Sequence, residues 1–201
     1  MRIAVDKNQV QAGSHYKSNF RNHRALEKMG HELVITVLPY GDYCEVTDKI
    51  SDIISRRGDR LKKLDFAGAI KVSVDRKGSI SEIAGNLCSS SREHERFHNE
   101  YALAQQCGCK FYILIEDDAV TSLDELEKWE NPRAKRYYQL KAYQAKGGKL
   151  KRQLPKQPPV SGKRLASSLR TVEREYGAKV VFCKPEDAAQ RIVEILKGGN
   201  E

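Results

Sequence analysis

The stretch "VSVDRKGSISEIAGNL" (72–87) decides the fold class, because a strand pattern and a helix pattern meet inside it. Its first residues alternate between apolar and polar, as in a strand, and the apolar residues of 80–87 recur at the spacing of one helical face. Between the two patterns lie three adjacent charges, Asp75, Arg76 and Lys77. The stretch therefore predicts a strand that leads directly into a helix, with charged residues at the junction.

Short runs rich in β-branched and aromatic residues recur along the chain, each bounded by charges or turn formers. They predict five strands, at 2–6, 31–39, 69–75, 110–117 and 178–184. Helical patterns lie between these runs or follow them, at 80–87, 92–106, 123–126, 165–176 and 185–196. Strands that alternate with helices indicate an α/β fold around a mixed sheet.

Two segments interrupt this alternation. Residues 47–66 are mostly polar and charged, and they predict a helix or a mobile loop inserted between two strands. Residues 145–162 are rich in proline, glycine and basic residues, which is typical of a linker or of a loop that orders on binding. We therefore expect a body at 1–144, a linker or DNA-binding loop at 145–162, and a small helix-strand-helix extension at 163–201 that packs on the body.

The chain is basic, with 36 lysines and arginines against 27 acids and a formal net charge of +9. The charge is concentrated between residues 131 and 170, where twelve basic residues and no acid occur. A polyanion is therefore the first partner to consider. Because a solvated surface is the usual role of a charge run, composition alone leaves both interpretations open.

The five cysteines are scattered and include no Cys-x-x-Cys pair, so a disulfide framework is not expected. No stretch has the apolar length of a membrane span, and the first residues lack the apolar core of a signal peptide. The sequence "SGKRL" (161–165) lacks the earlier glycine and the Ser or Thr of a phosphate-binding loop. We expect a soluble, cytoplasmic protein without a membrane partner or a nucleotide cofactor.

Three acids lie at the ends of predicted strands or in a turn beside them, namely Asp6, Asp42 and Asp75. If the strands are neighbours, these carboxylates come together, and a divalent cation makes such crowding tolerable. Alternate residues of a strand share a face, so Asp75 and Lys77 address one spot while Arg76 turns away. This arrangement suits a phosphodiesterase, in which carboxylates hold Mg²⁺, the metal activates water and an ammonium group steadies developing charge. A solvated strand end gives the same spacing, so spacing alone does not decide between the two.

The sequences "GDY" (41–43) and "VDRKGSISEIAGNL" (74–87) resemble the nuclease domain of XPF-type structure-specific endonucleases, within the PD-(D/E)XK superfamily. The resemblance covers residues 3–118, and the tail is similar to that of short stand-alone members in phages and bacteria. It implies a restriction-endonuclease-like core that cuts branched, forked or flapped DNA with Mg²⁺ or Mn²⁺. The site residues that it implies are Asp42 and Asp75 as metal ligands, Lys77 as the catalytic lysine, Asp6 as a supporting acid and Arg76 as part of the signature.

The chain departs from the family pattern in several places. The family's glutamate is Asp75 here, a shorter acid that can still bind a metal. The family's first motif is Val-Asp-x-Arg-Glu, whereas this chain has "VDKNQ" (5–9), without the arginine and the glutamate. The acid after Lys77 is displaced by one residue and falls on Glu82, which with Ser79 also fits a capping box at a helix start. The connection between the two motifs is also long for the family.

Basic residues of two segments are expected to bind DNA. Arg92 and Arg96 lie in the predicted helix 92–106 and would line a groove for the nucleic acid. In the acid-free basic tract the candidates are Lys135, Arg136, Lys149, Lys151 and Arg152. They would follow phosphates, and nearby tyrosines would stack on splayed bases of a single-stranded arm.

The sequence thus predicts a Mg²⁺-dependent endodeoxyribonuclease that prefers branched or partly single-stranded DNA. A Holliday-junction resolvase or a restriction-like nuclease of the same superfamily is the alternative among enzymes. A non-catalytic DNA-binding module with a decayed site is the alternative outside them. A homodimer and a bacterial or phage-infected host cell are further hypotheses, and the process, whether DNA repair, recombination or phage replication, stays open.

Overall fold

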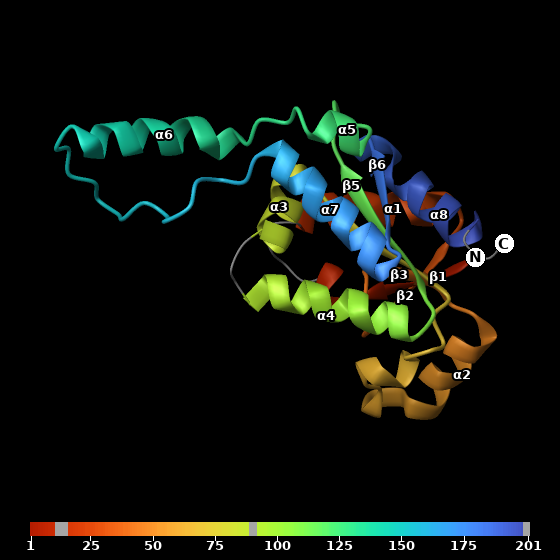
Figure 1. The fold of residues 1–201 in the computed structure, drawn as a ribbon. Helices are drawn as coiled ribbons and strands as arrows, with labels where there is room; N and C mark the ends of the chain where they lie inside the picture. The colour runs from red at the N-terminus through yellow and green to blue at the C-terminus, as the bar shows by residue number, and fades with distance from the viewer. Residues whose placement is uncertain (11–15, 89–91, 199–201) are drawn as a thin grey trace.

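The computed structural model describes residues 1–10, 16–88 and 92–198, which fold around one six-stranded mixed sheet (Figure 1). The strand order is β2-β1-β3-β4-β5-β6. The strands are β1 (Arg2–Asp6), β2 (Glu32–Thr36), β3 (Tyr43–Glu45), β4 (Val72–Lys77), β5 (Lys110–Glu116) and β6 (Lys179–Cys183). The pairs β1-β2, β4-β5 and β5-β6 are parallel, and β3 pairs antiparallel with both β1 and β4. The α/β class with a mixed sheet is confirmed.

Helices cover both faces of the sheet. On one face α1 (Tyr16–Lys28) and α8 (Ala188–Gly198) pack together, and α8 lies against β4 and β5. On the other face lie α3 (Ile80–Cys88), α4 (Arg92–Gln106) and α7 (Gly162–Tyr176). Each layer buries its own apolar cluster against the sheet, so alternate residues of strands such as β1 and β6 serve two cores.

All five predicted strand segments contain a strand, and the differences are local. β4 does not end at Asp75 but continues through Lys77, and all six of its residues are buried. The three charges at this point are therefore inside the protein rather than at a solvated strand end. β3 has only three residues and α1 is largely polar, so neither was predicted.

The segment between β3 and β4 forms ordered helical turns rather than a mobile loop. It contains α2 (Asp48–Arg57) and two 3-10 turns, η2 (Gly58–Arg60) and η3 (Lys63–Phe66). The Thr47 side chain caps α2 by accepting a hydrogen bond from the Ile50 amide. Ile50 and Phe66 are buried in the cluster on the α3 and α4 face, which fixes this insertion on the body.

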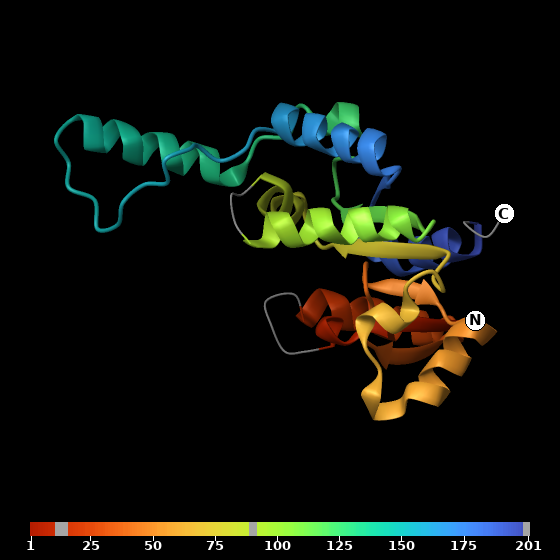
Figure 2. The same ribbon diagram turned by 60° about the horizontal axis from the view of Figure 1, so that its bottom comes forward.

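Residues 131–161, called the basic arm below, project from the body in both ribbon views (Figures 1 and 2). The arm begins beyond the short helix α5 (Leu123–Leu126), with α6 (Pro132–Ala145), which Asn131 caps and Pro132 opens. An irregular segment then returns to α7, and the Tyr137 hydroxyl donates to the Pro155 carbonyl at 3.3 Å. The predicted linker at 145–162 is thus the return half of the arm, and α6 is an additional helix.

The chain ends with α7, β6, the 3-10 turn η4 (Pro185–Asp187) and α8, which is the predicted helix-strand-helix order. β6 extends the same sheet by pairing with β5, and α8 packs on the face opposite α7. The division into residues 1–144, 145–162 and 163–201 stays a prediction. Within the described residues no helix is long and apolar enough to cross a membrane.

Candidate active site

A tight turn brings Asp42 between the ends of β1 and β4. Gly41 has φ +67°, and a Cβ at this position would run into the Ser73 side chain, so the turn requires glycine. The Asp42 amide donates to the Val74 carbonyl at 2.8 Å, and the Asp42 carbonyl accepts from the Asp6 amide at 2.9 Å. Because β3 is antiparallel to both neighbours, its beginning meets the carboxyl ends of β1 and β4. The three predicted acids are thereby gathered at one edge of the sheet.

Both carboxylate oxygens of Asp42 accept hydrogen bonds. Oδ1 accepts from Gln9 Nε2 at 2.7 Å, and Oδ2 accepts from the Arg76 amide at 2.8 Å. Loss of hydration, and next to it the negative charge of Asp75, hold the pKa of Asp42 well above its usual range. Ionisation of Asp42 beside Asp75 is therefore unfavourable, and a bound cation would favour it.

Asp75 and Lys77 point into the same cavity from alternate positions of β4. Their side chains form an ion pair of 2.9 Å, and both are buried. Burial alone would lower the pKa of Lys77, but the carboxylates of Asp75 and Asp42 hold it above the ordinary value. The ammonium nitrogen also lies 4.5 Å from the centre of the Phe97 ring, in cation-π contact. Lys77 is therefore a positioned, protonated group.

The second carboxylate oxygen of Asp75, Oδ2, is buried and has no hydrogen-bond partner in the described part of the chain. An unsatisfied buried carboxylate oxygen is costly, and hard divalent cations prefer oxygen ligands of this kind. Among the described residues no group of three or more His, Cys, Asp or Glu side chains has the arrangement of a metal site. The residues here that would hold a cation are Asp42 and Asp75, with water supplying further ligands.

Asp6 lies on the cavity wall, where its carboxylate organises the backbone. Oδ1 accepts from the Asn8 amide and Oδ2 from the Leu38 amide, both at 2.9 Å. These are the contacts of a turn former at a strand end. Its role as a supporting acid in catalysis stays a prediction.

Arg76 turns to the opposite face of β4, as the strand alternation predicts. Its Nε bonds to Glu116 Oε1 at 2.6 Å, and its Nη1 donates to Asn19 Oδ1 at 2.5 Å. Glu116 also accepts from Asn22 and Arg21, and its side chain is 2% exposed. Sequence reasoning missed Glu116, although it closes an apolar run as Asp75 nearly does. Arg76 reaches the cavity through its backbone, whose amide holds Asp42.

Glu82 makes contacts typical of a helix start. Its amide donates to Ser79 Oγ at 3.2 Å, and its carboxylate accepts from the Gly78 amide at 3.0 Å. In a capping box the Glu82 carboxylate would accept from the amide of the cap residue, Ser79. Here it accepts from the amide one residue earlier, that of Gly78. Glu82 also lines the cavity together with Asp42 and Asp75, so its place agrees with either role.

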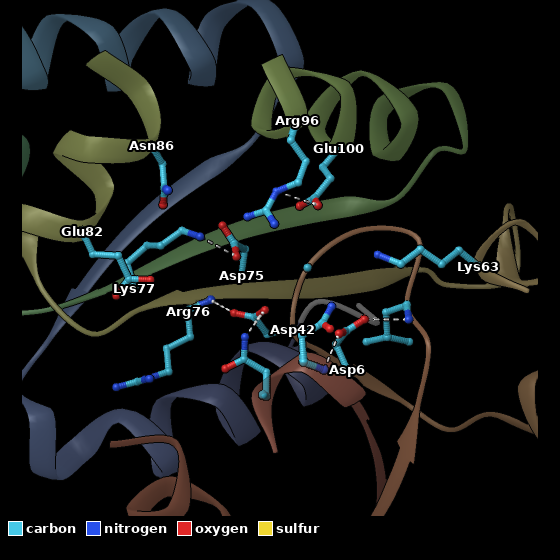
Figure 3. A pocket seen from close by; sticks show the side chains of 14 residues that line it. Asp6, Asp42, Lys63, Asp75, Arg76, Lys77, Glu82, Asn86, Arg96 and Glu100 are labelled. Atoms are coloured by element: carbon cyan, nitrogen blue, oxygen red, sulfur yellow. Dashed lines mark hydrogen bonds and ion pairs between the residues drawn. The ribbon is translucent and has the colours of Figure 1, made fainter. Parts of the chain in front are cut away.

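The cavity at this edge has a volume of about 270 Å³ (Figure 3). Its lining contains Asp6, Asp42, Asp75, Arg76, Lys77, Glu82 and Arg96, all predicted site residues, together with Glu100, Lys63 and Asn86, which sequence reasoning missed. Burial and the charge of Asp75 raise the pKa of Glu100 to about 7, with Arg96 opposing the rise. The spacing of Arg96 and Glu100, four residues apart on one helix, was the available signal for this acid.

The predicted DNA-binding residues fall in two places. Arg96 lies on α4 at the cavity, and Arg92 opens the same helix, but its side chain lies outside the described part of the chain. The basic arm carries the others: Lys135, Arg136, Lys149, Lys151 and Arg152. Tyr138 and Tyr143 are exposed there, whereas Tyr137 is buried against the returning segment and is not available for stacking.

The mixed sheet, with acids gathered beside the β3 turn and a lysine two residues after the last acid, defines a restriction-endonuclease-like α/β domain. Residues 5–196 match the family model of the ERCC4 domain, so the chain belongs to the ERCC4 domain family. Membership in this family supports an interpretation as a nuclease that acts on DNA.

Two solved structures share the fold. The chain is similar to XPF from Aeropyrum pernix, with 15% identity and a TM-score of 0.54, over 100% of this chain and 66% of that chain. It is also similar to XPF from Aeropyrum pernix in complex with DNA, with 16% identity and a TM-score of 0.51, over 99% and 64%. The chain thus spans about two thirds of the length of these proteins. Among curated proteins, none matches the chain by sequence.

Gln9→Glu is expected to strengthen Mg²⁺ binding about tenfold, since the charge and number of oxygen ligands set the affinity for hard cations. The amide nitrogen of Gln9 donates to Asp42, and a glutamate would replace this donor with a third carboxylate. Thermal unfolding at increasing MgCl₂ measures the effect, because a ligand that binds only the native state stabilises it by RT ln(1 + [L]/Kd) and so raises Tm. Gln139→Glu, on the exposed face of α6, is the matched control. An unchanged Mg²⁺ dependence of Tm would show that position 9 does not face the cation.

Proposed function

We propose that the protein is a divalent-metal-dependent DNA endonuclease that hydrolyses phosphodiester bonds, preferably in branched, forked or flapped DNA, with Mg²⁺ or Mn²⁺ as its cofactor. The observation that carries the proposal is the buried Oδ2 of Asp75, which no described protein group satisfies and which faces a cavity shared with Asp42 and Lys77. A pair of crowded carboxylates beside a fixed lysine is a costly arrangement unless it binds something of the opposite charge.

The chain's own residues have separable roles in this reaction. Asp42 and Asp75 would hold the cation, which activates water and polarises the phosphoryl oxygen when bound. Lys77 donates hydrogen bonds from a protonated amine, so it orients the attacking water or stabilises charge on the phosphate oxygens. Arg76 supports Asp42 through its backbone amide.

A non-catalytic DNA-binding module is the second candidate, and the contact of Gln9 with Asp42 favours it. The family pattern has an acid at this position, whereas the Gln9 amide satisfies one oxygen of Asp42 without a metal. Such a protein would keep the fold and its basic surface and would bind DNA without cutting it. A Holliday-junction resolvase or restriction-like nuclease remains the alternative among enzymes.

One assay separates these candidates. Labelled duplex, fork, flap and four-way junction DNA are incubated with the protein, each with Mg²⁺, with Mn²⁺ or with EDTA. Metal-dependent cleavage of forks and flaps supports the proposal, and preferred cleavage of the junction or of plain duplex would favour the enzyme alternatives. Binding of all four substrates without cleavage in either metal would overturn the proposed activity.

We further propose that the basic arm holds DNA beyond the cavity. Nine basic residues and no acid lie within residues 131–161, and the arm projects from the body with Tyr138 and Tyr143 exposed (Figure 1). Phosphate contacts of this kind release counterions, so they give affinity that falls with salt.

Replacing Lys149, Lys151 and Arg152 with glutamine is expected to weaken DNA binding and to make it less dependent on salt. Three phosphate contacts account for about 2 to 3 units in the slope of log Kobs against log salt. Fluorescence anisotropy of labelled fork DNA between about 50 and 300 mM NaCl measures the slope. The control replaces three exposed lysines away from the arm and the cavity, Lys28, Lys184 and Lys197. Equal slopes for the two triple variants would mean that the arm is a solvated surface.

The cytoplasmic localisation, the homodimer and the role in phage or bacterial DNA metabolism stay hypotheses. The five cysteines are all free, which agrees with a reducing compartment.

A further inference from the structure

A second cavity adjoins the carboxylate site and has a volume of about 360 Å³. One wall is η3 with the loop before Tyr40, and the other is α4. Its lining includes Pro39, Lys63, Arg96, Asn99, Glu100 and Leu103. Lys63, Arg96 and Glu100 line both cavities, so the two spaces adjoin at these three side chains.

The insertion between β3 and β4 is built to hold Lys63 at this junction. Asp65 Oδ2 accepts from the Lys62 amide at 2.8 Å and closes the turn that Lys63 begins. The other oxygen of Asp65 pairs with Arg57 at 2.8 Å, and Phe66 is buried in the core. A residue on an anchored turn presents its side chain more reproducibly than one on an unsupported loop. The Lys63 ammonium points toward the cavity in Figure 3, across from Arg96 and Glu100.

The charges of the two cavities differ in a way that suits a DNA strand. The first cavity is dominated by the acids Asp42 and Asp75, which suit a cation and repel phosphate. At the passage to the second cavity stand two cations, Lys63 and Arg96, beside the acid Glu100. Arginine and lysine bind phosphate by charge-assisted hydrogen bonds.

The second cavity also has a different chemical lining. Pro39 and Leu103 supply apolar surface, and Asn99 supplies an amide that can bond to a base edge. Its volume is at the lower end of small-ligand sites, which span about 300 to 1,000 Å³, so it suits one nucleotide rather than a duplex. A double helix would have to release one nucleotide to fill it.

We propose that this second cavity binds the nucleotide next to the phosphate that is cut, with Lys63 and Arg96 on its phosphate and the apolar wall against its sugar or base. The inference rests on the proposed nuclease function and specifies its substrate as a strand that is unpaired beside the cut. It assigns substrate binding to Lys63, a residue of the insertion rather than of either sequence motif.

The test combines a protein change with a substrate change. Lys63→Gln is compared with Lys62→Gln, its exposed neighbour outside both cavities. Each is assayed on fork DNA in which one phosphate at a time, across the cut site, is replaced by an uncharged methylphosphonate. We expect Lys63→Gln to lower kcat/KM about tenfold, chiefly through KM, and Lys62→Gln to have less than a twofold effect. At one position beside the cut, the methylphosphonate should slow the wild type about tenfold and slow Lys63→Gln no further.

The proposal is overturned if Lys63→Gln behaves as Lys62→Gln, or if every methylphosphonate slows Lys63→Gln as much as it slows the wild type. If the wild type cleaves no substrate, the proposed nuclease function fails, and the same series is then read by equilibrium binding. A methylphosphonate effect on affinity that depends on Lys63 would still support the nucleotide site, and its absence would reject it.

Discussion

Asp75→Asn should lower kcat/KM for DNA cleavage by at least about 10³-fold, because several kcal/mol of transition-state stabilisation depend on the metal that this carboxylate would hold. The substitution keeps the size of the side chain and removes the charge and one strong oxygen ligand. DNA binding should change little, since the basic arm supplies phosphate contacts elsewhere. Steady-state cleavage of a labelled flap, with fork-DNA anisotropy as the binding readout, measures both.

A second readout ties the loss of activity to metal binding. The wild type should gain thermal stability with rising Mg²⁺, because the cation relieves the repulsion between Asp42 and Asp75, and Asp75→Asn should lose this gain. Asp118→Asn, at an exposed acid just beyond β5, is the matched control and should behave as the wild type. Asp75→Asn also removes the carboxylate that pairs with Lys77 at 2.9 Å. Circular dichroism therefore checks that the variant is still folded. Cleavage by Asp75→Asn within threefold of the wild type would refute the assignment of the metal site.

The sequence was sufficient to predict five of the six described strands, because each lies in a short run rich in β-branched and aromatic residues. β3 was not predictable in the same way, since three residues are too few for a periodic pattern and its place depends on pairing with both β1 and β4. α1 carries few apolar residues and packs mainly against α8, which lies far away in the sequence. Contacts with other segments of the chain stabilise β3 and α1, so no short stretch of sequence predicts either element.

Most of the acids of the candidate site were predictable from the sequence, but the contacts between its side chains were not. The motif placed Asp42, Asp75 and Lys77 together, and the structure brings all three to one cavity. Glu100 enters the same cavity from α4, and its one local signal, Arg96 four residues earlier, indicates an ion pair on a helix rather than a place in the site. Glu116 was hidden for a related reason, because its partners come from α1 and β4.

Glu116→Gln should lower the free energy of unfolding by about 3 kcal/mol, because it leaves the buried guanidinium of Arg76 without its counter-charge. Urea unfolding at pH 7 measures the loss. The control is Glu32→Gln, which removes the exposed pair with Arg2 and should cost about 0.5 kcal/mol or less. Cleavage should fall as well, since Arg76 also positions the amide that holds Asp42.

The pH dependence of the stability difference shows whether Glu116→Gln acts through loss of the Arg76 ion pair or through loss of packing. Burial opposes ionisation of Glu116, but the hydrogen bond and charge of Arg76 outweigh it and hold the pKa of Glu116 below its ordinary value. The stability that the ionised group contributes is therefore fully present above the ordinary pKa, and it is lost as pH falls through the lowered pKa of the folded state. The difference between wild type and Glu116→Gln should accordingly narrow below about pH 4. A difference that stays constant from pH 7 to pH 3 would show that packing, rather than the Arg76 ion pair, is what Glu116 contributes.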